Sequence, residues 1–486
     1  MILRPTLKVP VSLLLLTLGA LAIHGYHPYA EDAEIYLPGI EKILQPGIFP
    51  VGTEFFQSHA SLTLFPNLIV TSLRLTHLPF DYALFCWHLA SIFLLLLACW
   101  ELSGKCFETA RARWGTVALI AASLTLPVAG TALYIMDQYL NPRNLAAFAA
   151  VFSIVRVLEK KYLRAGFWLG FAAVMHPLMA FFALSFCILL VGLERFESKL
   201  PTFALLLPFG LSFAPASPAY NEAARFHSFH YILHWQWYEW IGIVAPVALF
   251  WWFARVARSR HLRNLERICR ALIIYDVAYF AGALVISVPK RFQSLARIQP
   301  LRSLHLLYIL LLLLAGGLIA EYLLRDRGWR WIAFFLPMCA GMFFAQRALF
   351  PASAHVEWPW AAPRNEWAQA FLWIRHSTPT AALFAIDPFY IQIPGEDTVG
   401  FRALSEHSRL ADAVKDSGAV SMFPPLAEEW LDQFNAQKNW KQFDKQDFLR
   451  LQEKYGINWV VLQKPGVPNL ICPYQNPAVM VCRIVP

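Results

Sequence analysis

Residues 9–40 read VPVSLLLLTLGALAIHGYHPYAEDAEIYLPGI. The first half is an apolar run of the kind that crosses a membrane, which takes about 20 residues. Three acids, Glu31, Asp32 and Glu34, follow this run closely. Charge is costly inside lipid, so we expect these acids in water just outside the first span. The run also resembles a signal peptide. Because further apolar runs follow, we interpret it as an uncleaved span with the basic N-terminus in the cytoplasm.

The composition of the whole chain is that of a membrane protein with many spans. Of its 486 residues, 58% are hydrophobic and 15% are charged, and the mean hydropathy is +0.46. A soluble domain is about 25% charged. We therefore predict an α-helical polytopic protein with about eleven spans. These lie near residues 9–25, 82–102, 116–135, 144–158, 165–175, 178–193, 201–214, 236–254, 270–288, 303–323 and 330–348.

The segment 58–76 decides the topology. It contains His59, Pro66 and Arg74 and is either a twelfth span or a helix lying at the membrane interface. If it does not cross, the strongly basic short loops all face the cytoplasm, as the positive-inside rule requires. The rule therefore favours an interfacial helix. We read the net charge of +9 as this bias and not as a sign of nucleic-acid binding.

Two domains follow from this topology. Residues 1–349 form a transmembrane domain, whose first outside loop, 26–80, carries juxtamembrane helices. Residues 350–486 form an α/β domain, because helical patterns alternate there with apolar strand patterns. We expect a multi-pass protein of the cytoplasmic (inner) membrane, with its N-terminus in the cytoplasm and its C-terminal domain periplasmic or extracellular.

Two cysteines bracket the last predicted hairpin of the C-terminal domain, Cys472 and Cys482. An oxidising compartment would let them form a disulfide. The alternative is a pair of free, buried thiols.

Charged residues gather in the loops that this topology places outside. Asp137 and Arg143 lie in the second such loop, His176 in the third, and Arg297 and Arg302 in the fifth. The positive-inside rule does not predict arginines in outside loops. These arginines therefore indicate an anionic ligand such as a phosphate.

Helical geometry separates the acids of the first loop. If 31–44 is a helix, spacings of three and four place several residues on one face, namely Asp32, Tyr36, Ile40 and Ile43. That face is otherwise apolar, so Asp32 should point inward, with Glu31 as its nearest rival. Glu34 and Glu41 should form a solvated face. The alternative for Asp32 is a charge that stabilises a helix N-terminus.

The order of these features resembles the GT-C superfamily of polytopic membrane glycosyltransferases, in the layout of aminoarabinose- and protein-mannosyl-transferase-like members. In such proteins an outside loop with a motif like D-E-x-x-Y follows the first span, and EDAEIY (31–36) occupies that place here. A second acid opens the next outside loop, as Asp137 does in MDQYLNPR (136–143). The stretch GFAAVMHPLMAFF (170–182) carries His176 where many members have lysine.

The C-terminal part resembles the soluble domain of the same superfamily. FLWIRHSTP (371–379) resembles its opening and KYGINWVVLQKP (454–465) its end. DQYLNPRN (137–144) and HWQWYEW (234–240) also resemble a group of bacterial membrane proteins of this layout.

The resemblance implies transfer of a sugar from a polyprenyl-phosphate donor in the bilayer to a glycan, lipid or protein acceptor on the outer face. Asp32 is implied to act as general base or to orient the acceptor, with Asp137 and Glu31 as further catalytic candidates. The leaving phosphate needs cations, for which the candidates are Arg143, His176, Arg297 and Arg302. Candidates for contact with the acceptor or sugar are Tyr36, Gln138, Trp235 and Trp237.

No cofactor follows from the residues themselves. Some members of the superfamily use a divalent ion such as Mg²⁺ or Mn²⁺ and others do not, and Asp32 with Asp137 suits either mode. His227, His230 and His234 recur at helical spacing, which permits a metal site on one helix face.

Each candidate has a plainer alternative. The arginines suit lipid headgroups or a helix start, His176 a helix cap, and the tryptophans an interfacial aromatic belt. Two other functions also stay open. A transporter would use intramembrane acids such as Asp276. A non-catalytic envelope assembly protein would keep the fold without the chemistry.

Overall fold

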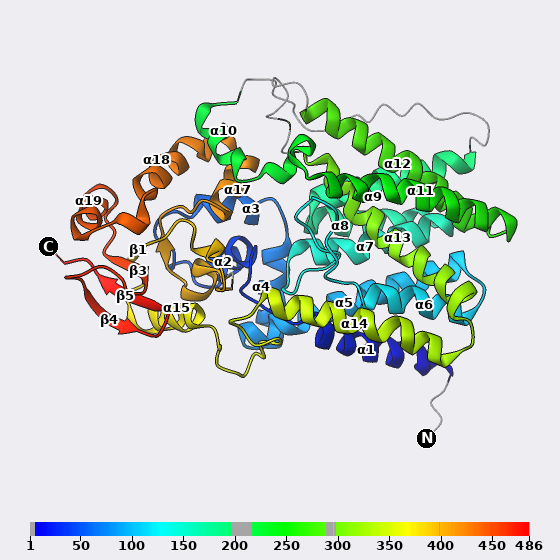
Figure 1. Cartoon of the computed structure of the whole chain (residues 1–486), viewed down its shortest axis with the longest axis horizontal. Coiled ribbons are helices and arrows are strands. Elements are labelled where there is room, and N and C mark those ends of the chain that lie inside the picture. Colours follow the sequence, from blue (N-terminus) through cyan, green and yellow to red (C-terminus); the bar gives the residue numbers. More distant parts are fainter. Residues whose placement is uncertain (1–4, 196–215, 288–294, 296–297, 398, 486) are drawn as a thin grey trace.

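A bundle of helices forms one end of the molecule and a mixed α/β domain forms the other (Figure 1). The computed structural model describes residues 5–195, 216–287, 295, 298–397 and 399–485. The bundle consists of α1 (Pro5–His24), α5 (Phe80–Cys106), α6 (Ala110–Ala121), α7 (Pro142–Leu158), α8 (Tyr162–Met175), α9 (Pro177–Arg195), α11 (Trp237–Ser259), α12 (Arg263–Ser287), α13 (Leu304–Leu318) with its π-helical continuation η5 (Ile319–Leu324), and α14 (Gly328–Leu349).

The bundle has the apolar helices of a membrane protein. Six helical segments of the described chain are long and apolar enough to cross a bilayer: Phe80–Cys106, Pro177–Glu194, Trp237–Ser259, Arg263–Ser287, Pro300–Leu324 and Gly328–Leu349. Shorter apolar helices cover Lys8–His24 and Tyr162–Met175. The predicted mostly helical membrane protein with a small C-terminal sheet is therefore confirmed, whereas the number of eleven spans stays a prediction.

The expected span 116–135 is wrong in its second half. Helix α6 ends at Ala121, and the chain then folds into an irregular loop with a β-bridge between Pro127 and Tyr134. Hydropathy alone suggested a helix, but proline lacks the donor that a helix interior needs. Gly130 is required in this loop because a Cβ there would lie 2.6 Å from the ring of Trp235. The expected span 201–214 lies outside the described residues.

Short helices connect the bundle to the C-terminal domain. They are α2 (Ala33–Leu44), α3 (Glu54–Ala60), α4 (Phe65–Thr76) and α10 (Pro218–Arg225). The segment 58–76 is divided between α3 and α4, with Pro66 in the first turn of α4. Both helices are shorter than the roughly 20 residues of a membrane span, so the choice against a twelfth span agrees with their length.

The C-terminal domain is built on a five-stranded sheet in the order β2-β1-β3-β5-β4. Strands β1 (Leu383–Ile386), β2 (Ser408–Arg409) and β3 (Trp459–Gln463) are parallel, and β4 (Ile471–Gln475) and β5 (Val479–Arg483) add an antiparallel hairpin. The helices are α15 (Glu366–Ser377), α16 (Phe401–Ser405), α17 (Lys415–Met422), α18 (Ala427–Gln437) and α19 (Lys445–Tyr455).

Both faces of this sheet are covered. Phe384 and Val461 pack with Phe371 of α15 on one face, and Ala385 and Val460 belong to the cluster of α19 on the other. Successive strand residues point to opposite faces. A strand buried on both faces therefore reads as a continuous apolar run, as WVVL (459–462) of β3 does.

The pattern of RLADAVKDSG (409–418) predicts a helix that ends at Gly418, but the structure differs. Arg409 lies in β2, and α17 begins only at Lys415 and continues through Gly418. The carboxylate of Asp412 accepts hydrogen bonds from the backbone N–H groups of Val414, Lys415 and Asp416 at 2.8, 2.6 and 3.0 Å. An aspartate that satisfies these donors stabilises a helix start, so the helix begins after Asp412.

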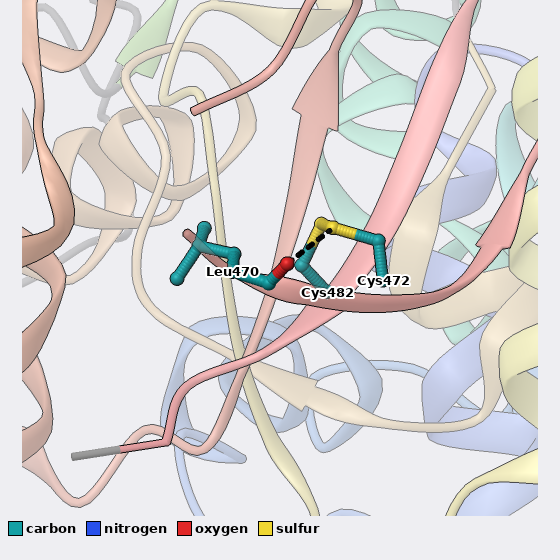
Figure 2. The surroundings of a disulfide bond; sticks show 3 residues. All are labelled: Leu470, Cys472 and Cys482. Atoms are coloured by element: carbon teal, nitrogen blue, oxygen red, sulfur yellow. Dashed lines mark hydrogen bonds between the residues drawn. A yellow bond between two sulfur atoms is a disulfide. The ribbon is translucent and has the colours of Figure 1, made fainter. Parts of the chain in front are cut away.

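Cys472 of β4 and Cys482 of β5 form a disulfide in the structure (Figure 2). It closes a loop with a sequence separation of 10 residues. Six further cysteines are free, and among them Cys86 is exposed.

We expect removal of this disulfide to destabilise the C-terminal domain. Replacing both cysteines by alanine should cost about 2–3 kcal/mol, since a cross-link removes entropy from the unfolded chain. Thermal unfolding of the purified protein with and without reductant measures the effect, and Cys86→Ser is the matched control. Peptide mapping that finds alkylated thiols on both Cys472 and Cys482 without reductant would contradict the pairing.

Candidate active site

Asp32 is the N-cap residue of α2, and α2 lies beside the C-terminal domain (Figure 1). Its backbone N–H donates to the hydroxyl of Tyr139 at 3.3 Å. Its carbonyl accepts the first helical hydrogen bond from the N–H of Tyr36 at 3.1 Å. The side chain keeps 31% of its surface exposed. Asp32 is thus fixed through its backbone, while its carboxylate stays reachable from solvent.

A lysine of the C-terminal domain binds this carboxylate. The ammonium of Lys415 lies 3.0 Å from Oδ1 of Asp32 and 2.6 Å from Oε2 of Glu31. Lys415 is the first residue of α17, and its side chain is 10% exposed. One nearly buried cation therefore bridges two neighbouring carboxylates of the first loop.

The cations around Asp32 keep it ionised. Burial alone would raise its pKa, but Lys415, Arg143 and Arg302 outweigh burial and hold the pKa of Asp32 well below its usual range.

Tyr36 packs edge-on against His59 and Phe65. Burial, together with the charge of Asp32, raises the pKa of Tyr36 to about 12, so its hydroxyl stays protonated.

A buried ionic network holds α17 against α2. Arg409 donates to Oε1 of Glu34 through Nε at 3.0 Å and through a terminal nitrogen at 2.8 Å. Arg409 also pairs with Asp412 and, at 3.3 Å, with Asp416. Arg402 binds Asp416 through two bonds of 2.8 and 3.0 Å. Every one of these side chains is at most 2% exposed.

The burial of Glu34 and Glu41 contradicts the orientation expected for α2. Both were expected on a solvated face, but Glu34 is 0% and Glu41 is 3% exposed. The other Glu34 oxygen accepts the backbone N–H groups of Arg402 and Ala403 at 2.7 and 3.3 Å. The C-terminal domain covers this face of α2, and helical periodicity cannot show that a second domain will do so.

The second acid is paired within its own loop. Oδ2 of Asp137 accepts from Arg143 at 2.5 Å and from Asn141 at 2.6 Å. Asn141 is the N-cap of α7 and accepts the N–H of Asn144 at 3.0 Å, and Pro142 follows it at the first helical position. Asp137 is 5% exposed, and it serves here to fix Arg143.

Arg302 has a different environment from Arg143. It lies in the short helix η4 (Pro300–Ser303). Among the described residues, no carboxylate forms an ion pair with its guanidinium within 4 Å, and its Nε lacks a hydrogen-bond partner. It interacts electrostatically with Asp32, Tyr36 and Arg143. Arg302 also lines a small pocket together with Thr131, Phe229, His230, Gln299 and Leu301.

The remaining predicted residues do not all gather at this place. His176 caps α8 and interacts electrostatically with Arg143 and Arg302, which brings it into the same group. The side chain of Gln138 donates to Gln346 and is buried. Trp235 is buried and donates to the carbonyl of Phe229 at 2.9 Å. Trp237 is 75% exposed, and Arg297 lies outside the described residues.

The acids do not form a metal site. Asp32 already binds Lys415 and Asp137 already binds Arg143. In the described part of the chain, no three His, Cys, Asp or Glu residues are grouped so that they could hold an ion. His227, His230 and His234 lie in or beside two 3₁₀ turns and not on one helix, and Nε2 of His227 pairs with the hydroxyl of Ser417 at 2.9 Å. A divalent ion therefore does not fit the residues present.

The sequence did not reveal Lys415 as a site residue. It lies 383 residues from Asp32 in the chain, in a stretch that reads as an ordinary polar helix. The one available signal was Asp412 three positions earlier, which has the spacing of a helix cap and so marks Lys415 as the start of a helix.

No known protein family matches the sequence, and no curated protein is similar to it. Among solved structures, the chain is similar to the oligosaccharyltransferase of Archaeoglobus fulgidus in its apo form, with 13% identity and a TM-score of 0.46 over 93% of this chain and 69% of that one. The same values hold for AglB of Archaeoglobus fulgidus in complex with an inhibitory peptide and a dolichol-phosphate. We draw no conclusion from these matches about donor, acceptor or catalysis.

Proposed function

We propose that this protein is a membrane glycosyltransferase that moves a sugar from a polyprenyl-phosphate donor to an acceptor on the face of the membrane that carries the C-terminal domain. We further propose that this face is periplasmic or extracellular. The basic loops lie at the other end of the bundle, and the positive-inside rule assigns such loops to the cytoplasm. The sugar and the acceptor are set by the shape of the site and are not specified by its charges.

The guanidinium of Arg302 is the observation that carries this proposal, because it interacts electrostatically with Asp32 and has no ion-pair partner among the described residues. Arg143 is neutralised by Asp137, whereas Arg302 has no partner carboxylate within ion-pair distance among the described residues. Arg302 is half-buried, and a cation that is partly removed from water without a counter-ion is costly unless an anion binds. A phosphate suits it, because guanidinium groups bind phosphate oxygens with paired hydrogen bonds.

The chemistry needs a cation at the leaving group and a carboxylate at the acceptor. The bond between the anomeric carbon and the phosphate oxygen breaks, and the phosphate leaves with the electron pair. The acceptor hydroxyl forms the new bond to the anomeric carbon and loses its proton. Arg302, which interacts electrostatically with Arg143 and His176, stabilises the phosphate, and Asp32 receives the hydrogen bond of the attacking hydroxyl.

The environment of Asp32 favours the orienting role over that of a strong base. A general base works best when its pKa lies near the operating pH, and the cations around Asp32 hold its pKa far below that. Lys415 binds Oδ1, which leaves Oδ2 for the acceptor. Asp32 therefore fixes the hydroxyl, and the proton is released to water as the new bond forms.

Binding of the donor phosphate tests this proposal. We expect Arg302→Gln to weaken the binding of a short-chain polyprenyl monophosphate at least about tenfold, because a hydrogen bond to a charged group contributes about 1.5–3 kcal/mol. Titration of the probe into the detergent-solubilised protein, followed by intrinsic fluorescence, measures the dissociation constant.

The matched control is Arg225→Gln. Arg225 is an exposed arginine that pairs with Glu222 at 2.7 Å and is expected to leave binding unchanged. An unchanged affinity in Arg302→Gln, in a protein that elutes like the wild type, would rule out Arg302 as the phosphate ligand.

A further inference from the structure

We propose that Lys415 is the resident cation of this site, which takes the place of a divalent metal ion at Glu31 and Asp32 and is supplied by the C-terminal domain. The inference rests on the proposed function only in treating Asp32 as part of the site. It predicts that the wild-type protein binds no divalent ion there, and that removal of the lysine charge creates a metal site.

The contacts of Lys415 are those expected of a bound cation. Its ammonium lies 2.6 Å from a Glu31 oxygen and 3.0 Å from an Asp32 oxygen. Mg²⁺ and Mn²⁺ bind in the same way, by drawing carboxylate oxygens of neighbouring residues onto one centre. Glu31 adopts a left-handed backbone conformation with φ 53°. In this conformation the side chains of two consecutive acids contact the same ammonium.

Lys415 is held in place and is not a mobile surface lysine. Its backbone N–H donates to Asp412 at 2.6 Å. Asp412 is bound by Arg409, which is bound by Glu34 of α2. The helix that carries the lysine is therefore tied to the helix that carries Asp32, so the stem of Lys415 starts from a fixed backbone position.

The surrounding charges also disfavour a second cation. Arg143 and Arg302 both act on Asp32 in addition to Lys415. A divalent ion at Oδ1 of Asp32 would lie within a few ångströms of the ammonium, where like charges repel strongly. The carboxylates are available to a metal only when the lysine charge is absent.

Binding of Mn²⁺ tests the inference directly. The full chain in detergent is stripped with a chelator and titrated with Mn²⁺, and the paramagnetic resonance signal of free Mn²⁺ reports what remains unbound. We expect Lys415→Gln to bind one Mn²⁺ per chain at least about tenfold more tightly than the wild type, since two carboxylates lose their counter-ion. Adding Glu31→Gln to this variant should abolish the gain.

Two further variants separate charge from structure. Lys415→Arg keeps the charge and should bind no more Mn²⁺ than the wild type. Lys454→Gln removes a lysine of the same domain that pairs with exposed Asp432 at 2.6 Å, and it should also behave like the wild type. Thermal unfolding provides a second readout, because Mn²⁺ should raise the transition temperature of Lys415→Gln and of no other variant.

Two results would overturn the inference. In the first, the wild-type protein binds one Mn²⁺ and Asp32→Asn abolishes this binding. That result does not depend on the folding of any lysine variant. The other is folded Lys415→Gln that gains no Mn²⁺. Neither readout requires transfer activity. A protein without glycosyl transfer that shows the expected Mn²⁺ pattern would therefore refute the proposed function and leave this inference standing.

Discussion

Asp32→Asn is expected to lower the rate of glycosyl transfer at least about 100-fold, the range for loss of a positioned proton acceptor or of one key electrostatic contact. Asparagine has the size of aspartate and can still accept the hydrogen bond of Lys415 through its side-chain oxygen. It cannot carry the negative charge that orients the acceptor hydroxyl. The loss should therefore appear in the rate of transfer, with normal protein levels and a normal elution profile.

The measurement is transfer of labelled sugar from a polyprenyl-phosphate donor in membranes that contain equal amounts of each variant. Glu31→Gln is the matched control, because Glu31 shares the ammonium of Lys415 but is the more exposed acid, at 43%. We expect its rate to fall less than that of Asp32→Asn. A larger loss in Glu31→Gln would assign the role to Glu31, and full activity in Asp32→Asn would refute the enzymatic role of this site.

The second large effect is expected from Arg409→Met. This arginine is 0% exposed and binds Glu34, Asp412 and Asp416. Its removal leaves buried carboxylates with too little positive charge, and breaking a buried pair by removing one partner costs about 3–5 kcal/mol. We expect the free energy of unfolding to fall by this amount and α17 to separate from α2.

Chemical unfolding of the solubilised protein measures this loss, and limited proteolysis near residue 410 reports the separation. Arg450→Met is the control, since Arg450 forms an exposed pair with Asp447 one helical turn away, and such pairs contribute little. The double variant Glu34→Gln/Arg409→Met should lose less than the sum of the single variants, because the two side chains interact directly. Unchanged stability in Arg409→Met would show that the network does not hold the two helices together.

The local pattern of the sequence was sufficient for the secondary structure of most elements. Apolar runs of sufficient length mark the long helices α5, α12 and α13, because a membrane span depends only on the hydropathy of consecutive residues. It failed at 122–135, where the apolar run contains Pro127 and folds into a loop. Hydropathy measures the preference for lipid or core and does not distinguish a buried helix from a buried loop.

For the candidate site too, the sequence predicted local properties and missed those that depend on the tertiary fold. Helical periodicity placed Asp32 and Tyr36 on one face, since the spacing of residues on a helix is a local property, but the structure leaves the Asp32 side chain 31% exposed. Periodicity placed Glu34 and Glu41 in water, because it had no means of showing that the C-terminal domain covers that face. The same covering domain provides Lys415, the residue on which the ionisation of Asp32 depends most strongly.

By itself, the sequence determined that this is a helical membrane protein with an α/β tail and with acids just after its first apolar helix. The tertiary structure alone decided which of these acids is buried, that Glu31 and Asp32 bind Lys415, and that Arg302 has no carboxylate partner among the described residues. The physical reason is that burial and ion pairing depend on distance in space. Asp32 and Lys415 are 383 residues apart in sequence and 3.0 Å apart in the fold, and no local pattern contains that information.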